Sequence, residues 1–287
     1  MSDASAETTT APTVDRVEQA ERFRALHDGP EPLLIPNAWD AGSAKLLVGM
    51  GFQAVATTSS GFAASLGRLD GYTMDDEALA NAAVVVRAAG AVPVSADLEN
   101  GYADEPDKVR ITLLNALGVG LSGCSIEDYT GRADDPLYDL KFAAERIEAA
   151  ATIAHRGPTR MVLTGRAENF IRGRPDLADT IARLQAYQEA GADVLFAPGI
   201  SNPADIRSVV SSVDRPVNVL ALPNCPPVAE LAELGVRRIS IGGAFAYAAY
   251  GAMIEAATEL RDQGTYGYWA KTGIGRSAVQ EHFGPQS

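Results

Sequence analysis

The segment from Val92 to Asp104, VPVSADLENGYAD, carries two acids whose spacing could bind a cation. Its apolar beginning predicts a short buried strand, and Asp97 and Glu99 follow where that strand should end. Alternate residues of a strand point to the same side, so the two acids repel each other unless a cation lies between them. Asn100-Gly101 then predicts a turn. A hard cation such as Mg²⁺ suits this pair. A helix N-terminus with both acids solvated is the alternative that the stretch alone leaves open.

The composition excludes several classes of partner. The 287 residues are 46% hydrophobic and 21% charged, which is typical of a globular chain with one large domain. The net charge of −13 and the pI of about 4.7 argue against nucleic acid or an anionic membrane surface as a partner. No apolar run reaches the ~18 residues of a membrane helix. Two cysteines, Cys124 and Cys225, predict cytosolic thiols and a cytoplasmic protein, and three histidines are too few for a histidine-built metal site.

Short apolar segments alternate with amphipathic segments eight times along the chain, which predicts an α/β fold of the (β/α)₈ TIM barrel type. An open doubly wound sheet is the second choice, without a dinucleotide site because no G-x-G-x-x-G follows the first strand. Strands are expected at residues 33–35, 54–56, 92–96, 121–126, 161–164, 194–196, 217–220 and 238–241. Helices are expected at residues 14–27, 41–50, 73–89, 105–117, 141–155, 175–190, 203–213, 228–234 and 244–263.

Three parts are expected along the chain. Residues 1–13 are rich in Ser, Ala, Thr and acids and lack the pattern of a signal peptide, so we expect a disordered lead. Residues 14–264 form the barrel domain, beginning with an N-terminal helix. Residues 265–287 form a helical tail with several aromatic residues.

Polar residues collect where the expected strands end. In a (β/α)₈ barrel this rim holds the active site. Buried acids are costly unless they are paired or bind a metal, so the set as a whole favours a site over separate helix caps and ion pairs. The strand-end residues are Asn37, Asp40, Thr57, Thr58, Ser59, Ser60, Asp97, Glu99, Glu127, Asp128, Arg166, Glu168, Pro198, Asn218, Gly242 and Gly243.

Three of these acids and one arginine carry the predicted chemistry. Asp97, Glu99 and Glu127 would hold Mg²⁺, or Mn²⁺ as the alternative ion, directly or through water. Arg166 can pair with a substrate carboxylate in a bidentate way. A salt bridge from Arg166 to Glu168 or Glu127 is its alternative role.

Two neighbouring segments complete the predicted site. The turn at residues 59–61 can present backbone N–H groups to an oxyanion, or it can be an ordinary loop. Residues 61–72 form a long glycine-containing connection. It predicts a mobile lid that brings in Arg68 and Asp70 on closing, and a plain surface loop is the alternative.

These residues resemble the isocitrate lyase / phosphoenolpyruvate mutase superfamily, over about residues 33–264. The resemblance implies a Mg²⁺ enzyme that acts on a small anionic 2-oxo acid through an enolate held by the metal. It also implies a homodimer or homotetramer in which the C-terminal helix is exchanged between subunits. The segments that carry it are Thr57-Thr58-Ser59-Ser60, Ser65-Leu66-Gly67-Arg68-Leu69-Asp70, Asp97-Leu98-Glu99-Asn100-Gly101-Tyr102, Ile126-Glu127-Asp128 and Arg166-Ala167-Glu168.

The resemblance also implies roles for single residues. Asp97, Glu99 and Glu127 would be the metal-site acids. The catalytic residues would be Arg166, Asp70 as the lid acid, and Glu127. The substrate contacts would be Thr58, Ser59, Ser60, Arg166 and Asn218.

The chain departs from the superfamily pattern in the loop at residues 129–135. It lacks the Cys and His of the lyases and the Lys-Asn pair of the mutases, and Pro198 stands near the position of a mutase His. We therefore expect cleavage of a carbon–carbon bond in a 2-oxo dicarboxylate, as in oxaloacetate decarboxylation.

Two alternatives remain at this point. The first is chemistry at a phosphorus–carbon bond, as in a phosphonomutase or a phosphonopyruvate hydrolase, with Arg68, Arg132 and Lys141 as the nearby cations. The second is a carboxylate-binding barrel without catalysis.

Overall fold

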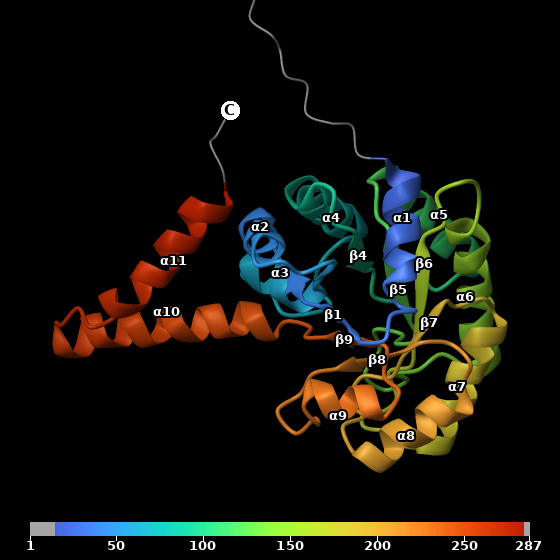
Figure 1. The fold of residues 1–287 in the computed structure, drawn as a ribbon. Helices are drawn as coiled ribbons and strands as arrows, with labels where there is room; N and C mark the ends of the chain where they lie inside the picture. The colour runs from blue at the N-terminus through green and yellow to red at the C-terminus, as the bar shows by residue number, and fades with distance from the viewer. Residues whose placement is uncertain (1–14, 284–287) are drawn as a thin grey trace, which may run out of the picture.

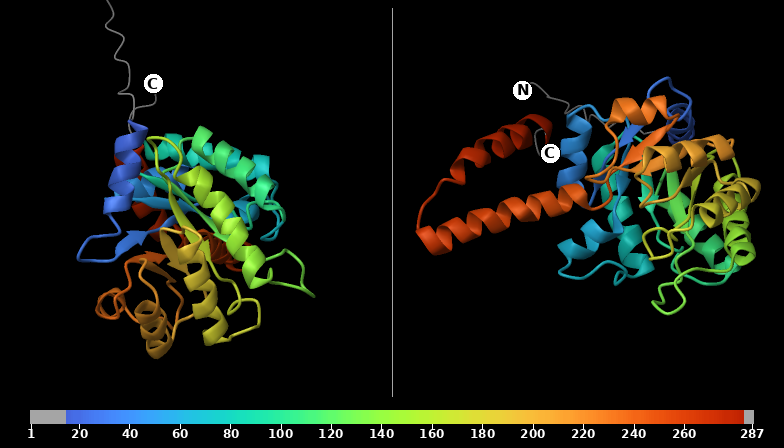
Figure 2. Two further views of the ribbon diagram at one scale, coloured as in Figure 1. Left: turned by 90° about the vertical axis from the view of Figure 1, so that its right-hand side faces the viewer. Right: turned by 90° about the horizontal axis from the view of Figure 1, so that it is seen from below.

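The computed structural model describes residues 15–283. A single parallel sheet is rolled into a barrel with helices on its outside (Figure 1; Figure 2). The strands are β1 (Leu33–Ile35), β2 (Asn37–Ala38), β3 (Val55–Thr57), β4 (Val94–Asp97), β5 (Gly123–Glu127), β6 (Val162–Arg166), β7 (Val194–Phe196), β8 (Val217–Leu220) and β9 (Arg238–Ser240). The helices are α1 (Arg16–Ala25), α2 (Ala41–Gly49), α3 (Ser59–Ser65), α4 (Asp75–Ala89), α5 (Pro106–Gly118), α6 (Leu140–Ala154), α7 (Leu177–Glu189), α8 (Pro203–Ser212), α9 (Val228–Glu233), α10 (Ala244–Gln263) and α11 (Trp269–His282).

The barrel is closed by one strand that is broken at Pro36. Its first half, β1, pairs in parallel with β9, and its second half, β2, pairs in parallel with β3. Asn37 links the two neighbours of this broken strand. Its Nδ2 donates to the Thr57 carbonyl in β3 at 2.6 Å, and its Oδ1 accepts from the backbone N–H groups of Ile241 and Gly242, just after β9, at 3.0 Å. The two halves act as one strand of an eight-stranded barrel, so the predicted α/β class and (β/α)₈ fold are confirmed. The expected disordered lead at residues 1–13 lies outside the described residues.

Helix α1 closes the end of the barrel opposite the strand C-termini. Its Phe23 is fully buried with Leu33, Ala54 and Val162, at the beginnings of three strands. A Cβ on Gly123 would lie 2.6 Å from the Phe23 ring, so glycine is needed at that position for the helix to approach. The strand beginnings that surround Phe23 are therefore apolar and packed against α1.

Residues 59–65 form helix α3, so the expected turn and the expected beginning of the loop at residue 61 were wrong. Thr58 caps the helix by accepting a hydrogen bond from the Gly61 N–H at 3.2 Å. A Cβ on Gly61 would lie 2.7 Å from Thr58 Cγ2 and 3.1 Å from the Ala246 Cβ. Gly61 therefore serves close packing of α3 and not chain flexibility, which the sequence pattern does not distinguish.

The C-terminal segment is helical, as the sequence predicts. Helix α10 leaves the barrel and extends away from it, and α11 turns back toward α2 (Figure 1; Figure 2). Gly264, in the left-handed region with φ 65°, ends α10. Ala246 is the one buried residue in α10.

Two further observations concern the described residues as a whole. None of their helices has the length and apolar character needed to cross a membrane. Cys124 and Cys225 are both free thiols, and Cys124 is buried.

We expect His27 to make folding pH-dependent. Its ring is buried, with Nδ1 donating to the Phe23 carbonyl at 2.9 Å, and burial followed by the charge of Arg238 lowers its pKa to about 4. Because the unfolded chain binds this proton from about pH 6.5 downward, stability is lost as the pH falls from 6.5 to 4. The loss reaches at most about 3 kcal/mol. Urea unfolding of the wild type and of His27→Leu between pH 4 and 7 measures the difference. Parallel pH profiles for the two proteins would contradict this assignment.

Candidate active site

Two connected cavities lie at the C-terminal ends of the strands. The inner cavity, of about 180 Å³, reaches down inside the barrel, and the outer one, of about 440 Å³, opens above it. Ser59, Asp70 and Arg166 line both cavities and mark the boundary between them. The predicted rim therefore surrounds a hollow in which a small molecule can bind.

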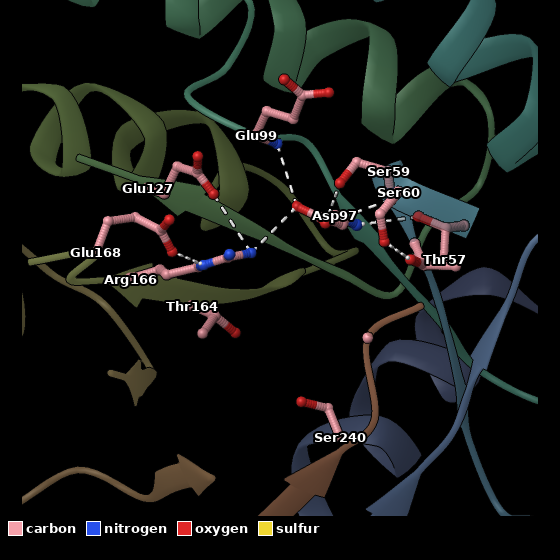
Figure 3. Close-up of polar contacts among 12 residues, drawn as sticks. Thr57, Ser59, Ser60, Asp97, Glu99, Glu127, Thr164, Arg166, Glu168 and Ser240 are labelled. Carbon is pink, nitrogen blue, oxygen red and sulfur yellow. Dashed lines mark hydrogen bonds and ion pairs between the residues drawn. The ribbon is translucent and has the colours of Figure 1, made fainter. Parts of the chain in front are cut away.

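Arg166 is at the centre of this boundary and contacts three carboxylates (Figure 3). Its Nη1 lies 3.3 Å from Glu127 Oε2 and 3.7 Å from Asp97 Oδ1, and its Nε donates to Glu168 Oε1. Burial alone would lower the pKa of Arg166, but the charges of Glu127, Glu168 and Asp97 raise it above its usual value. The guanidinium also lies over the Phe196 ring, 5.2 Å from its centroid. Arg166 is therefore charged and held in one orientation, and its alternative role as a salt-bridge partner is realised.

A second arginine, Arg172, supports the same carboxylates. Its Nη2 lies 2.9 Å from Glu168 Oε2 and 3.8 Å from Glu127 Oε1, and its guanidinium stacks 3.5 Å from the centroid of the Tyr129 ring. The sequence analysis missed Arg172. Arg172 could have been found from its position four residues after Glu168, because side chains at that spacing lie close together in a helical turn.

Asp97 connects strand β4 to the beginning of α3. Its Oδ2 accepts from Ser59 Oγ at 3.0 Å and from the Ser59 N–H at 3.4 Å, and its Oδ1 accepts from the Glu99 N–H at 3.2 Å (Figure 3). Its own N–H donates to Thr57 Oγ1 at 3.0 Å. The predicted metal acid and the predicted oxyanion segment are thus in direct contact.

The acids on this side of the cavity carry more negative charge than the neighbouring cation neutralises. Burial, then the charges of Asp97 and Asp70, raises the pKa of Glu99 to about 7. Burial and the Asp97 charge also raise the pKa of Asp70. Arg166 opposes both shifts but is shared with Glu127 and Glu168. The arrangement favours an additional cation.

A Mg²⁺ ion that keeps several of its waters fits this donor set. Within residues 15–283, no three Asp, Glu, His or Cys side chains converge closely enough to hold a metal by themselves. Glu127 contacts both Arg166 and Arg172, while Asp97 contacts Arg166 and accepts a hydrogen bond from the Glu99 N–H. The assignment of Asp97, Glu99 and Glu127 to the metal site stays a prediction, with water between the ion and part of this set.

Asp128, the other strand-end acid of β5, lies outside both cavities. It is buried and accepts from the Glu168 N–H at 2.8 Å, from Arg183 Nη1 at 3.0 Å and from the Tyr187 hydroxyl at 2.5 Å. It therefore positions Glu168, which in turn orients Arg166.

The remaining predicted residues divide into those that face the cavities and those that do not. Thr58 and Ser60 line the inner cavity. Asn218 also lines the inner cavity, from within β8 and below the strand end, and its Nδ2 donates to Ser240 Oγ at 3.0 Å. Asp70 already lies at the cavity, whereas Arg68 is paired with Glu77 at 2.6 Å and lines neither cavity. The expectation that Arg68 and Asp70 act together is therefore not met in this conformation.

Residues 23–261 match the family model described as phosphoenolpyruvate phosphomutase. This chain belongs to that family, within the isocitrate lyase / phosphoenolpyruvate mutase superfamily.

Similar proteins of this superfamily span different activities. A solved protein of Burkholderia cenocepacia J2315, of unassigned lyase or mutase activity, is 49% identical with a TM-score of 0.86, covering 88% of this chain and 91% of that one. An uncharacterized protein of Mycobacterium tuberculosis is 34% identical, over 77% of this chain and 81% of its own. An oxaloacetate decarboxylase of Bradyrhizobium diazoefficiens is 29% identical, over 69% of each chain.

One wall of the outer cavity in this superfamily member is formed by Tyr129, Gly131 and Ala133, from the loop at residues 129–135, which contains no Cys or His. This wall contains no thiol or imidazole to serve as an acid or base.

We expect Arg166→Met to destabilise the fold as well as the site. Removing one partner of a buried ion pair leaves the Glu127 and Glu168 carboxylates uncompensated, which costs about 3–5 kcal/mol. Urea unfolding in the presence of EDTA measures the change. Arg110→Met is the control, since it removes a solvent-exposed pair with Asp107, a kind of pair that contributes about 0–1 kcal/mol. Equal effects of the two substitutions would show that the buried cluster is not required for stability.

Proposed function

We propose that this protein is a Mg²⁺-dependent lyase that cleaves a carbon–carbon bond in a small 2-oxo carboxylate through an enolate, in the manner of an oxaloacetate decarboxylase. The observation that carries the proposal is the cluster of Asp97, Glu127 and Arg166 where the inner and outer cavities meet, with Glu99 beside it. Membership of a superfamily that contains lyases and mutases supports this proposal.

The side chains of the site have distinct roles in the proposed reaction. Arg166, held by Glu127 and Glu168, orients a substrate carboxylate at the top of the inner cavity. Ser59 and Ser60, in the first turn of α3, face the same cavity: Ser59 holds Asp97 through its hydroxyl and N–H, and Ser60 stabilises the developing oxyanion. Asp70 narrows the opening between the two cavities and limits the access of water. When bound, Mg²⁺ supplies Lewis-acid stabilisation of the enolate charge.

The metal proposal has support from a relative of the same fold. A phosphonopyruvate hydrolase, 24% identical with a TM-score of 0.76, was solved with oxalate and Mg²⁺. Oxalate has the two adjacent oxygen-bearing carbons of a pyruvate enolate, which makes it a suitable probe for this site. The chain's own support is the group of Asp70, Asp97 and Glu99, whose mutual repulsion a divalent cation would relieve.

Phosphorus–carbon chemistry has less support. It requires cations for a phosphoryl group, and the three that the sequence suggests for this role are engaged elsewhere: Arg68 with Glu77, Arg132 with Asp104 at 3.4 Å, and Lys141 with Glu145 at 3.8 Å. None of the three candidates lines either cavity. The carbon–carbon reaction is therefore the preferred proposal.

We also propose that the protein is a cytoplasmic homodimer or homotetramer in which the C-terminal helices pack between subunits. Helices α10 and α11 extend beyond the barrel (Figure 1) and expose large apolar side chains to solvent in the single chain. Those side chains are Phe245, Tyr247, Met253, Ile254, Leu260, Trp269 and Ile274. Burying such a surface against a second copy is the usual reason for its presence.

Pyruvate release from oxaloacetate tests the proposed reaction. Wild type with Mg²⁺ is expected to exceed the spontaneous rate, and EDTA is expected to abolish the excess. Asp97→Ala is expected to lower kcat/KM roughly 100-fold or more, because it removes both a metal-site acid and the contact to Ser59. Asp75→Ala, on the exposed first turn of α4, is the matched control and is expected to leave the rate unchanged.

The outcomes separate the competing functions. Absence of pyruvate release together with Mg²⁺-dependent oxalate binding would reject the decarboxylase and direct the search to phosphonopyruvate, followed by phosphorus NMR. Oxalate binding without turnover of any 2-oxo acid would indicate a binding protein. Turnover that is indifferent to EDTA and to Asp97→Ala would reject the metal site.

Light scattering after gel filtration tests the oligomer. The wild type is expected at twice or four times the chain mass of 30.1 kDa. The double substitution Met253→Glu and Ile254→Glu places two charges in the apolar surface of α10 and is expected to reduce the mass toward that of a single chain. Gln263→Glu, at the end of the same helix, is the control. A wild type that elutes as a single chain would refute the proposal.

A further inference from the structure

Arg238 is a buried cation on the wall of the inner cavity. It comes from strand β9 and is 5% exposed. In a (β/α)₈ barrel, strand positions whose side chains point into the barrel are normally occupied by Val, Ile or Leu. The arginine therefore requires an explanation beyond packing.

The contacts of Arg238 are all with neutral groups. Its Nε donates to Asn218 Oδ1 and its Nη2 donates to Thr164 Oγ1, both at 2.9 Å. Its Nη1 is buried and has no hydrogen-bond partner within residues 15–283. No carboxylate in that part of the chain forms an ion pair with Arg238, whereas Arg166 at the rim has three.

The surroundings below the cavity do not neutralise this charge. His27 lies just beyond the C-terminal end of α1, and its Nε2 also has no partner among the described residues. The charge of Arg238 helps to keep that imidazole neutral, so it supplies no negative charge. Burial lowers the pKa of Arg238 to about 9, and the guanidinium still carries its proton at neutral pH. A buried charge without a counter-ion costs free energy, which a bound anion would recover.

Serine hydroxyls surround the same space. Ser95, Ser125 and Ser240 line the inner cavity, and none of them donates a hydrogen bond to another described residue. Ser240 lies below Asp97 and Arg166 in Figure 3, and its Oγ accepts from Asn218, which leaves its proton available. Small side chains at these positions keep the cavity open and provide donors without acceptors. Donors without acceptors, next to an unpaired cation, match the chemistry of a carboxylate.

We propose that Arg238 and Ser240 form an anion subsite at the floor of the cavity, which binds a second carboxylate of the substrate while Arg166 orients the first at the rim. The substrate is then a dicarboxylate that lies along the barrel axis, and Asn218 and Thr164 position the guanidinium. This inference rests on the proposed function, because it assigns the far end of the same substrate. It explains how a chain with a net charge of −13 selects a dianion.

Binding of two unreactive acids tests the subsite without requiring turnover. L-malate and 2-hydroxybutyrate have the same four carbons and the same 2-hydroxy acid end, and differ in the second carboxylate. In calorimetric titrations with Mg²⁺, the wild type is expected to bind malate at least about tenfold more tightly than 2-hydroxybutyrate. Arg238→Met is expected to remove this difference and to leave 2-hydroxybutyrate binding unchanged.

Two further variants complete the design. Arg238→Lys retains the charge and is expected to keep part of the malate preference, which also covers the case in which the Met variant fails to fold. Ser240→Ala is expected to weaken malate binding several-fold, with 2-hydroxybutyrate unaffected. Circular dichroism and thermal unfolding verify that each variant is folded.

The results separate this inference from the proposed reaction. A malate preference that depends on Arg238, in a protein that releases no pyruvate from oxaloacetate, would support the subsite and reject the decarboxylase. Pyruvate release with equal affinity for the two acids would do the reverse. A malate preference that persists in the folded Arg238→Met protein, or a wild type that does not bind malate, would overturn the subsite.

Discussion

The ion cluster of Arg166 with Glu127 and Glu168 is the interaction on which the site depends. These groups are withdrawn from water at the ends of β5 and β6, so each requires a partner of opposite charge. Asp128 holds the backbone of Glu168 and is itself held by Arg183 and Tyr187 from α7. The orientation of the central guanidinium is thus determined by a chain of contacts that extends from the cavity to the outer helices.

The charges are divided along the barrel axis. The rim has an excess of carboxylates, with Asp70, Asp97 and Glu99 beside an arginine that is already shared. The interior has a single arginine, Arg238, among neutral hydroxyl and amide groups. A cation suits the first environment and an anion suits the second. This separation is the basis for proposing Mg²⁺ at the rim and a carboxylate at the floor.

Membership of the superfamily constrains the chemistry without specifying it. The fold and the rim acids are compatible with lyases, hydrolases and mutases, and the relatives include several of these activities. In this chain the groups that could select a substrate are the loop around Gly131 and Ala133, which carries no Cys or His, and the polar layer inside the barrel.

The sequence by itself determined the barrel and the identity of the rim, because strand–helix alternation and polar residues at strand ends are local patterns. It did not reveal that residues 59–65 are helical, since Gly61 serves a close contact with Ala246, which is distant in the chain. The sequence places Arg238 in a predicted strand, where a charged residue is unusual and indicates a special role. Whether Arg238 has a counter-ion depends on the side chains of all the strands around it, which only the tertiary structure shows. The tertiary structure alone decided which carboxylates Arg166 pairs with and which cation remains unpaired, because charge compensation depends on distances in space between residues far apart in the chain.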